Sequence, residues 1–203
     1  MLNNCFALIL SCEKYSFKRE RQNIEHLPMN YRYFIGNPDL QDPIEEGKIV
    51  YLPCPDDYEY LTKKTLLAFK WIRENVGFVD YVLKTDDDVV FKKEKIIEMV
   101  NNLKDNKIDY AGIFHKGGYH SPHHFGKCSD KRLNKILMPV PDVTYCIGGA
   151  YWISEKAQKI IGSIKDYKPY SSIFEDACIG NILVSNGIKP VQIDVRSAIN
   201  WND

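Results

Sequence analysis

Short apolar runs alternate with amphipathic stretches over most of the chain. The run Cys5–Cys12 is almost continuously apolar and predicts a central strand. The segment Tyr60–Val76 places apolar residues at helical spacing, which predicts the clearest helix of the chain. Further strands are predicted at 30–37, 48–54 and 109–115. Strands that alternate with helices indicate an α/β layer structure around a largely parallel sheet.

Weaker signals predict the remaining elements. The polar segment 16–26 favours a helix, and a second helix is predicted over 93–103. Ser154 is a suitable N-cap for the helix that follows it. Alternating valine and isoleucine residues predict a last strand at 189–195.

The stretch Tyr81–Phe91 holds three aspartates inside an apolar run. On a strand, Asp86 and Asp88 would share one face, roughly 7 Å apart, while Asp87 turns away. Ligands of open α/β sheets bind beyond the carboxyl ends of the strands, and crowded carboxylates at that edge suit Mg²⁺ or Mn²⁺ holding a diphosphate. The alternative is a solvated turn, with Asp88 capping the next helix.

Two later stretches depart from their surroundings. Gly148 and Gly149 interrupt the apolar run 145–154, which indicates a bulge or a close approach of the backbone to another group. Glu175 and Asp176 stand in the first turn of a predicted helix. The simplest interpretation of this acidic pair is a favourable interaction with the helix dipole.

The segment 116–141 breaks the alternation of strands and helices. Its glycine, proline, serine and histidine content predicts a long loop, and loops of that length are usually functional or mobile. A zinc site could be drawn from His120, His123, His124 and Cys128, but no second ligand pair has structural-zinc spacing. We favour a substrate-facing or exposed polar loop.

Composition narrows the class of protein. A chain of 203 residues can bury one sizeable core, so residues 1–203 are expected to form a single domain. The formal net charge is zero and no basic stripe is present, so no nucleic-acid partner is expected. Six scattered cysteines without C-x-x-C spacing indicate buried thiols.

The apolar stretch near the start is too short to span a bilayer or to act as a signal sequence. The chain as given therefore has no predicted membrane segment, and a cytoplasmic setting is expected. A missing N-terminus would mimic this absence.

Four stretches together resemble the β-1,3-galactosyltransferase family, glycosyltransferase family 31. Asp56–Thr65 is similar to D-x-Y-x-N-L-T-x-K-T, and Tyr81–Phe91 to F-x-L-K-x-D-D-D-V-F. Tyr145–Ser154 is similar to Y-C-x-G-x-G-Y-x-x-S, and Glu175–Gly180 to E-D-V-Y-x-G. Each motif is weak by itself, but the four appear in the family's order.

The resemblance implies a GT-A-type, Rossmann-like, mostly parallel sheet flanked by helices. It also implies an inverting enzyme that moves a hexose or N-acetylhexosamine from a UDP-sugar to a hydroxyl of a carbohydrate or glycoprotein acceptor, forming a β-1,3 linkage. Mn²⁺ or Mg²⁺ would assist the departure of UDP. Because animal members of the family are usually anchored in Golgi membranes, the resemblance implies the Golgi lumen if an N-terminal anchor is missing. Asp88 would hold the metal, with Asp86 on ribose or on metal-bound water.

The same resemblance assigns Asp176 as the general base, with Glu175 as the alternative. Gly148 and Gly149 would let the backbone approach a sugar. Candidates for contacts to the nucleotide or its phosphates are Asp86, Asp87, Lys64 and Arg21. The two basic residues are the weaker candidates, because most lysines on amphipathic helices face solvent.

Departures from the family pattern keep two other classes open. Glu25 stands where the family has an arginine, and no histidine follows His124, although the family places one near the metal. Diphosphate and water would then complete the coordination, or the chain is a shortened form. A binding module for nucleotide sugars without transferase activity is one alternative. Another metal-dependent nucleotide enzyme, such as a nucleotidyltransferase or phosphohydrolase, is the second.

Overall fold

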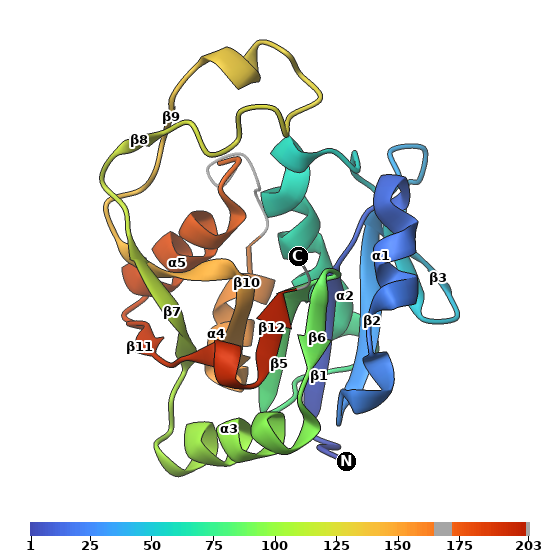
Figure 1. Cartoon of the computed structure of the whole chain (residues 1–203), viewed down its shortest axis with the longest axis vertical. Helices are drawn as coiled ribbons and strands as arrows, with labels where there is room; N and C mark the ends of the chain where they lie inside the picture. Colours follow the sequence, from blue (N-terminus) through green and yellow to red (C-terminus); the bar gives the residue numbers. More distant parts are fainter. Residues whose placement is uncertain (165–171, 202–203) are drawn as a thin grey trace.

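The computed structural model describes residues 1–164 and 172–201, apart from the Trp201 side chain. The chain forms a mixed α/β fold with one large sheet between helices (Figure 1). The helices are α1 (Ser16–Arg21), α2 (Leu61–Asn75), α3 (Lys93–Asp105), α4 (Glu155–Gly162) and α5 (Glu175–Ser185). No helix in these residues has the length and apolar character needed to cross a bilayer.

The central sheet has eight strands in the order β11-β7-β10-β5-β1-β2-β4-β3. These are β1 (Cys5–Leu10), β2 (Asn30–Gly36), β3 (Ile44–Glu46), β4 (Ile49–Leu52), β5 (Tyr81–Asp86), β7 (Tyr110–Lys116), β10 (Thr144–Ser154) and β11 (Val191–Gln192). All run in one direction except β3 and β10. Two small sheets pair β6 (Val89–Phe91) with β12 (Ile199–Trp201), and β8 (His120–Ser121) with β9 (Met138–Pro139).

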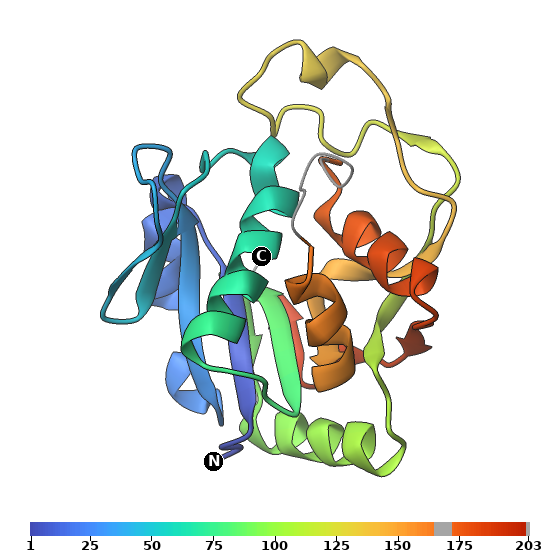
Figure 2. The ribbon, with the colours of Figure 1, turned by 180° about the vertical axis from the view of Figure 1, so that it is seen from behind.

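Alternation along the buried strands divides the core into two layers. On β1, Phe6 and Leu8 face α2, α4 and α5, whereas Ala7 and Ile9 face the layer that contains α3. Figure 2 shows α2, α4 and α5 side by side on the first face. Because both faces are covered, β1 can be apolar throughout, as its sequence predicts. The mostly parallel α/β fold is confirmed.

Three expected elements need correction. The predicted helix 16–26 ends at Arg21, because the Gln22 side chain turns inward and accepts a hydrogen bond from the Tyr33 hydroxyl at 2.8 Å. The predicted strand 189–195 is only β11, because Val195 leaves the sheet to pack in the α3 layer.

The third correction concerns the aspartate stretch. Residues 81–91 form two strands, β5 and β6, with a bend between them at Asp87 and Asp88. Strand alternation therefore holds up to Asp86 and does not extend to Asp88.

Other predicted details are confirmed. Ser154 caps α4 by accepting a hydrogen bond from the backbone N–H of Ala157. Glu175 and Asp176 open α5, and Cys5 and Cys54 are buried thiols. The long segment after β7 includes β8, β9 and a 3₁₀ turn, so the predicted loop has some structure of its own.

Gly180→Ala tests how closely α5 packs against β10. A Cβ at position 180 would overlap the Cβ of Tyr145, so the helix or the strand must shift. We expect the free energy of unfolding to fall by about 1–3 kcal/mol in urea denaturation. Gly162→Ala in α4 is the matched control, because its Cβ would meet Arg73 at an ordinary 3.4 Å. Equal stability of the two variants would contradict this packing.

Candidate active site

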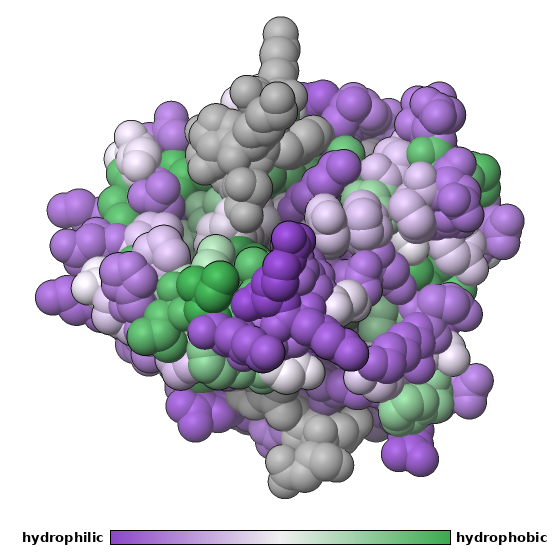
Figure 3. Space-filling view, turned by 90° about the horizontal axis from the view of Figure 1, so that it is seen from above, coloured by the Kyte–Doolittle hydropathy of each residue, from purple (hydrophilic) through white to green (hydrophobic). Residues whose placement is uncertain are grey.

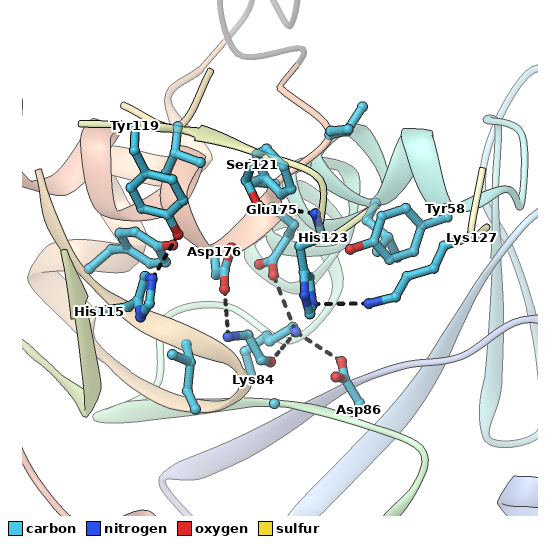
Figure 4. Close-up of a pocket in the computed structure, with 18 residues that line it drawn as sticks. Tyr58, Lys84, Asp86, His115, Tyr119, Ser121, His123, Lys127, Glu175 and Asp176 are labelled. Atoms are coloured by element: carbon cyan, nitrogen blue, oxygen red, sulfur yellow. Dashed lines mark hydrogen bonds and ion pairs between the residues drawn. The ribbon is translucent and has the colours of Figure 1, made fainter. Parts of the chain in front are cut away.

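A pocket of about 500 Å³ opens at the edge of the sheet where β5 ends (Figure 4). Lys84 and Asp86 lie at its floor. One wall is formed by Gly148 and Gly149 of β10 together with the first turn of α5. Residues 117–141, here named the roof loop, close the pocket from the other side.

Lys84 is the charge at the centre of this pocket. The side chain is almost fully buried, although it carries a charge. Its Nζ lies 3.0 Å from Asp86 Oδ1 and 3.3 Å from Glu175 Oε2, and it donates to the carbonyl of Gly148. Burial opposes the charged form, but the carboxylates of Asp86 and Glu175 outweigh it and raise the pKa of Lys84. The ammonium therefore stays protonated and joins β5, β10 and α5.

Glu175 is buried in the first turn of α5. One carboxyl oxygen accepts a hydrogen bond from the Tyr151 hydroxyl, and the other faces Lys84. Burial raises the pKa of the Glu175 carboxyl to about 7, although the Lys84 charge acts against the shift. Glu175 is only 5% exposed, and the Tyr151 and Lys84 side chains hold its oxygens, so it is suited to support the site.

Asp176 points into the pocket from the next position of the helix (Figure 4). Its Oδ2 accepts a hydrogen bond from the backbone N–H of Gly148 at 2.9 Å, and its Oδ1 accepts one from Ala177 at 2.8 Å. Backbone donors thus fix the carboxylate, while its surface remains open to the cavity. Of the two acids, Asp176 has the better geometry for accepting a proton from a ligand.

The glycines of β10 bring the backbone into the site. The register of β10 against β7 shifts between Cys146 and Tyr151, which is a bulge around Gly148 and Gly149. A Cβ at position 148 would stand 3.3 Å from Glu175 Oε2, tighter than an ordinary contact. Gly149 accepts a hydrogen bond from the Thr85 hydroxyl at 2.9 Å. The bulge expected from the sequence is present.

The three aspartates of the central stretch point to different partners. Asp86 lines the pocket beside Lys84, and burial raises the pKa of its carboxyl. Asp87 accepts a hydrogen bond from the Ser11 hydroxyl at the end of β1. Asp88 Oδ2 lies 2.8 Å from the Nζ of Lys18 on α1, while its Oδ1 is buried without a hydrogen-bond partner among the described residues.

The two basic candidates lie outside this pocket. Lys64 is buried. Its Nζ contacts Asp56 Oδ1 at 2.5 Å and donates to the carbonyl of Ser11 at 3.0 Å, so its charge is compensated inside the fold. Arg21 is exposed and stacks over the ring of Phe17. Lys64 therefore ties α2 to the ends of β1 and β2, which explains the lysine of the first motif.

The histidines of the roof loop have separate roles. His124 is buried with its Nε2 near the carbonyl oxygens of Leu133 and Ile136, whereas His123 faces the pocket and contacts Lys127 Nζ at 2.9 Å. Within residues 1–164 and 172–201, no group of three or more His, Cys, Asp or Glu is arranged to hold a metal ion. A zinc site in this loop is therefore not supported.

Several lining residues were missed by the sequence interpretation. The largest omission is Lys84, whose signal was a charged residue inside the apolar run of β5. Tyr58, the tyrosine of the first motif, also lines the pocket, as do His115, Tyr119 and Lys127, which come from segments without a recognisable spacing. Their aromatic rings and polar groups suit a sugar, which presents apolar faces and hydroxyls.

Comparison with known proteins identifies the family of this chain. The galactosyltransferase family model matches residues 22–194, so the chain belongs to that family. The UDP-GalNAc:beta-1,3-N-acetylgalactosaminyltransferase 1 of Rattus norvegicus is 28% identical over 140 residues, covering 66% of this chain and 40% of that protein. The lactosylceramide 1,3-N-acetyl-beta-D-glucosaminyltransferase A of Danio rerio is 26% identical over 146 residues, covering 66% of this chain and 36% of that protein.

A solved structure supports the fold alone. It is a glycosyltransferase involved in the glycosylation of the major capsid of PBCV-1, with a TM-score of 0.51 and 14% identity. The match covers 94% of this chain and 81% of that structure. The fold is of the GT-A type, as the motifs imply. The chain matches only about 40% of the length of the first curated relatives.

Glu175→Gln tests the buried acid through the pH dependence of stability. The folded protein holds the Glu175 proton up to about pH 7, whereas the unfolded chain releases it near 4.5. This group therefore stabilises the fold below pH 4.5, and its contribution is lost as the pH rises to about 7. The variant lacks that loss, so its stability relative to wild type should grow by about 1–3 kcal/mol across the window.

Urea unfolding at pH 4.5 and 7.5 measures this difference. Glu74→Gln, on the exposed end of α2, is the control and should follow the wild type at both pH values. If Glu175→Gln also follows the wild type, Glu175 is not a raised, buried acid.

Proposed function

We propose that this chain carries the catalytic core of an inverting, metal-dependent glycosyltransferase. The donor would be a UDP-sugar, and the product a β-1,3-linked hexose or N-acetylhexosamine on a glycan. The observation that carries the proposal is the placement of Asp176. It faces a pocket of sugar size while backbone N–H groups fix its carboxylate.

The transfer needs a base because a sugar hydroxyl is a weak nucleophile. The acceptor oxygen attacks the anomeric carbon of the donor, and the bond from that carbon to the diphosphate oxygen breaks. Asp176 takes the hydroxyl proton, and UDP leaves with the electron pair of the broken bond. Lys84 and Glu175 act indirectly, because they hold the backbone of Gly148 and the start of α5 around Asp176.

In this proposal, Asp88 is the ligand of a hard divalent cation. Asp88 offers a buried oxygen with no hydrogen-bond partner among the described residues, and carboxylate oxygens are the preferred ligands of Mn²⁺ and Mg²⁺. When bound, the ion neutralises charge that develops on the departing diphosphate. Asp86 would orient the ion's water ligands or the ribose. The ion pair between Lys18 and Asp88 would have to open or share the carboxylate.

That ion pair also favours a second candidate function. An ammonium beside Asp88 supplies positive charge without a metal, as in a nucleotide-sugar-binding module that lacks transferase activity. Hydrolysis of a UDP-sugar without acceptor separates the two, because a pure binding module releases no UDP.

Several donor sugars are compatible with this proposal. Relatives are named for transfer of N-acetylgalactosamine and N-acetylglucosamine, and human beta-1,3-galactosyltransferase 4 is 30% identical over 78 residues, covering 32% of this chain and 21% of that protein. A screen of UDP-galactose, UDP-GalNAc and UDP-GlcNAc by UDP release identifies the donor. The cytoplasmic setting, with the Golgi lumen as its alternative, stays a prediction.

Asp176→Asn removes the base and keeps the shape of the side chain. We expect kcat to fall by about 10²–10⁴-fold while the Kd for UDP, measured by calorimetry, changes little. Asp80→Asn, at the opposite end of β5, is the control and should keep wild-type turnover. Retained turnover in Asp176→Asn would move the base to another residue.

The metal assignment is tested by chelation and by binding. EDTA should abolish transfer, and added Mn²⁺ or Mg²⁺ should restore it. Asp88→Asn should weaken Mn²⁺ binding in the presence of UDP by at least about tenfold in calorimetry, whereas Asp80→Asn should not. Full activity in EDTA, with unchanged Mn²⁺ binding by Asp88→Asn, would assign the stabilisation of UDP to Lys18 instead.

A further inference from the structure

The candidate active site has a charged end and an end lined by aromatic rings. Asp86 and Lys127 lie on one side of Asp176, and His115 and Tyr119 lie on the other (Figure 4). In an inverting transfer, the attacking hydroxyl and the leaving diphosphate stand on opposite faces of the donor's anomeric carbon. Asp86 belongs to the diphosphate side of the proposed reaction. The acceptor should therefore approach Asp176 from the side of His115 and Tyr119.

Three aromatic rings meet at that second end. The His115 ring packs edge-on with Tyr119 and with Tyr145, at 5.9 and 5.6 Å between ring centroids. The Nε2 of His115 also lies 2.7 Å from the hydroxyl oxygen of Tyr119. Tyr145 is buried, whereas Tyr119 is 40% exposed. Tyr119 therefore leaves ring surface open to a ligand, while His115 holds its hydroxyl.

The backbone fixes the position of Tyr119. Two glycines join it to β7. A Cβ at Gly117 would overlap the carbonyl oxygen of Pro141, and Gly118 has a φ of +88°, which other residues rarely adopt. The N–H of Val140 donates to the carbonyl of Tyr119 at 2.8 Å. The ring is thus positioned on folding, before a ligand binds, and such preorganisation lowers the cost of binding.

The roof loop, which carries Tyr119, covers this part of the molecule from above. Figure 3 shows that hydrophilic side chains dominate the surface on that side, with smaller apolar groups between them. Tyr119 lines the pocket together with Ser121 and Val140 of the same loop. Its ring is therefore accessible to a ligand in the pocket, beside a hydroxyl and an apolar side chain.

The charges of the pocket favour an uncharged acceptor. Two lysines are present among its described lining residues. Lys84 already pairs with two carboxylates, and Lys127 lies on the side away from Tyr119 (Figure 4). A carboxylate or sulfate on a sugar beside Tyr119 would have neither lysine next to it and would face the carboxylate of Asp176. Like charges brought together in this way oppose binding.

We propose that Tyr119 is the stacking surface for the ring of the acceptor sugar, and that this sugar is uncharged. The C–H groups on one face of a pyranose would cover the tyrosine ring, while a hydroxyl of the same sugar reaches Asp176. The assignment to the acceptor rests on the proposed transferase function. Stacking of a neutral sugar on Tyr119 does not, so the two are tested separately.

Saturation-transfer NMR titrations measure sugar binding without transfer. The probes are the methyl β-glycosides of galactose, glucose, N-acetylglucosamine and N-acetylgalactosamine, added to the full chain with UDP and Mn²⁺. We expect at least one of them to bind, and Tyr119→Ala to weaken its binding at least about tenfold. Tyr119→Phe keeps the ring, so its affinity should stay within about threefold of wild type.

Phe125→Ala is the matched control for the loss of an aromatic ring. Phe125 is 39% exposed on the same loop and does not line the pocket. This variant should bind the glycoside as wild type does, and the Kd for UDP, measured by calorimetry, should be the same in all variants. The stacking surface is overturned if no glycoside binds to wild type, or if Tyr119→Ala and Phe125→Ala bind alike.

The C6 uronic acid of the glycoside that binds tests the preference for an uncharged sugar. It differs from the neutral probe by one carboxylate, and it should bind at least about tenfold more weakly. Asp176→Asn removes the facing charge and should narrow this difference. Equal or tighter binding of the acid by wild type would overturn the uncharged acceptor.

Transfer assays test the assignment to the acceptor. With the glycoside that binds, Tyr119→Ala should raise the KM for the acceptor at least about tenfold and leave the KM for the UDP-sugar near that of wild type. A raised KM for the UDP-sugar with an unchanged KM for the acceptor would place the ring against the donor and overturn the assignment. If the glycoside binds as expected but wild type does not transfer to it, the transferase function fails and Tyr119 remains a sugar-binding residue.

Discussion

The site depends on one buried ammonium group. Asp86 and Glu175 both converge on Lys84, and their carboxylates would repel one another without its charge. Removing a partner from such a buried pair leaves an uncompensated charge and costs far more than a surface ion pair. The charge of Lys84 therefore stabilises the contact between β5 and α5.

Lys84 is also connected to Asp176 through the backbone of Gly148. Lys84 donates to the carbonyl of Gly148, and the N–H of Gly148 donates to Asp176. Both hydrogen bonds require the bulge of β10 to come close to α5, which a side chain at position 148 would hinder. Asp176 is thus oriented by backbone that a buried charge holds, and no flexible side chain separates the two.

Periodicity predicted the architecture well, because apolar alternation is a local property of the chain. β1, α2, α5 and the bulge around Gly148 follow from their own residues. The bend at Asp87 and Asp88 does not, since Ser11 and Lys18, about 70 residues earlier, set the direction of those side chains. Long-range polar contacts of this kind leave no trace in local spacing.

Burial gives the two adjacent acids of α5 different chemical properties. Both acids line the pocket, but successive helix positions point in different directions, so Glu175 is buried beside Tyr151 whereas Asp176 is partly exposed. Desolvation raises the pKa of Glu175 to about 7, and the Tyr151 and Lys84 side chains hold its oxygens, whereas backbone N–H groups of Gly148 and Ala177 hold those of Asp176. Environment, not residue type, thus makes one acid structural and the other available to a ligand. A sequence motif can name both acids, but only the packing of α5 against β10 tells them apart.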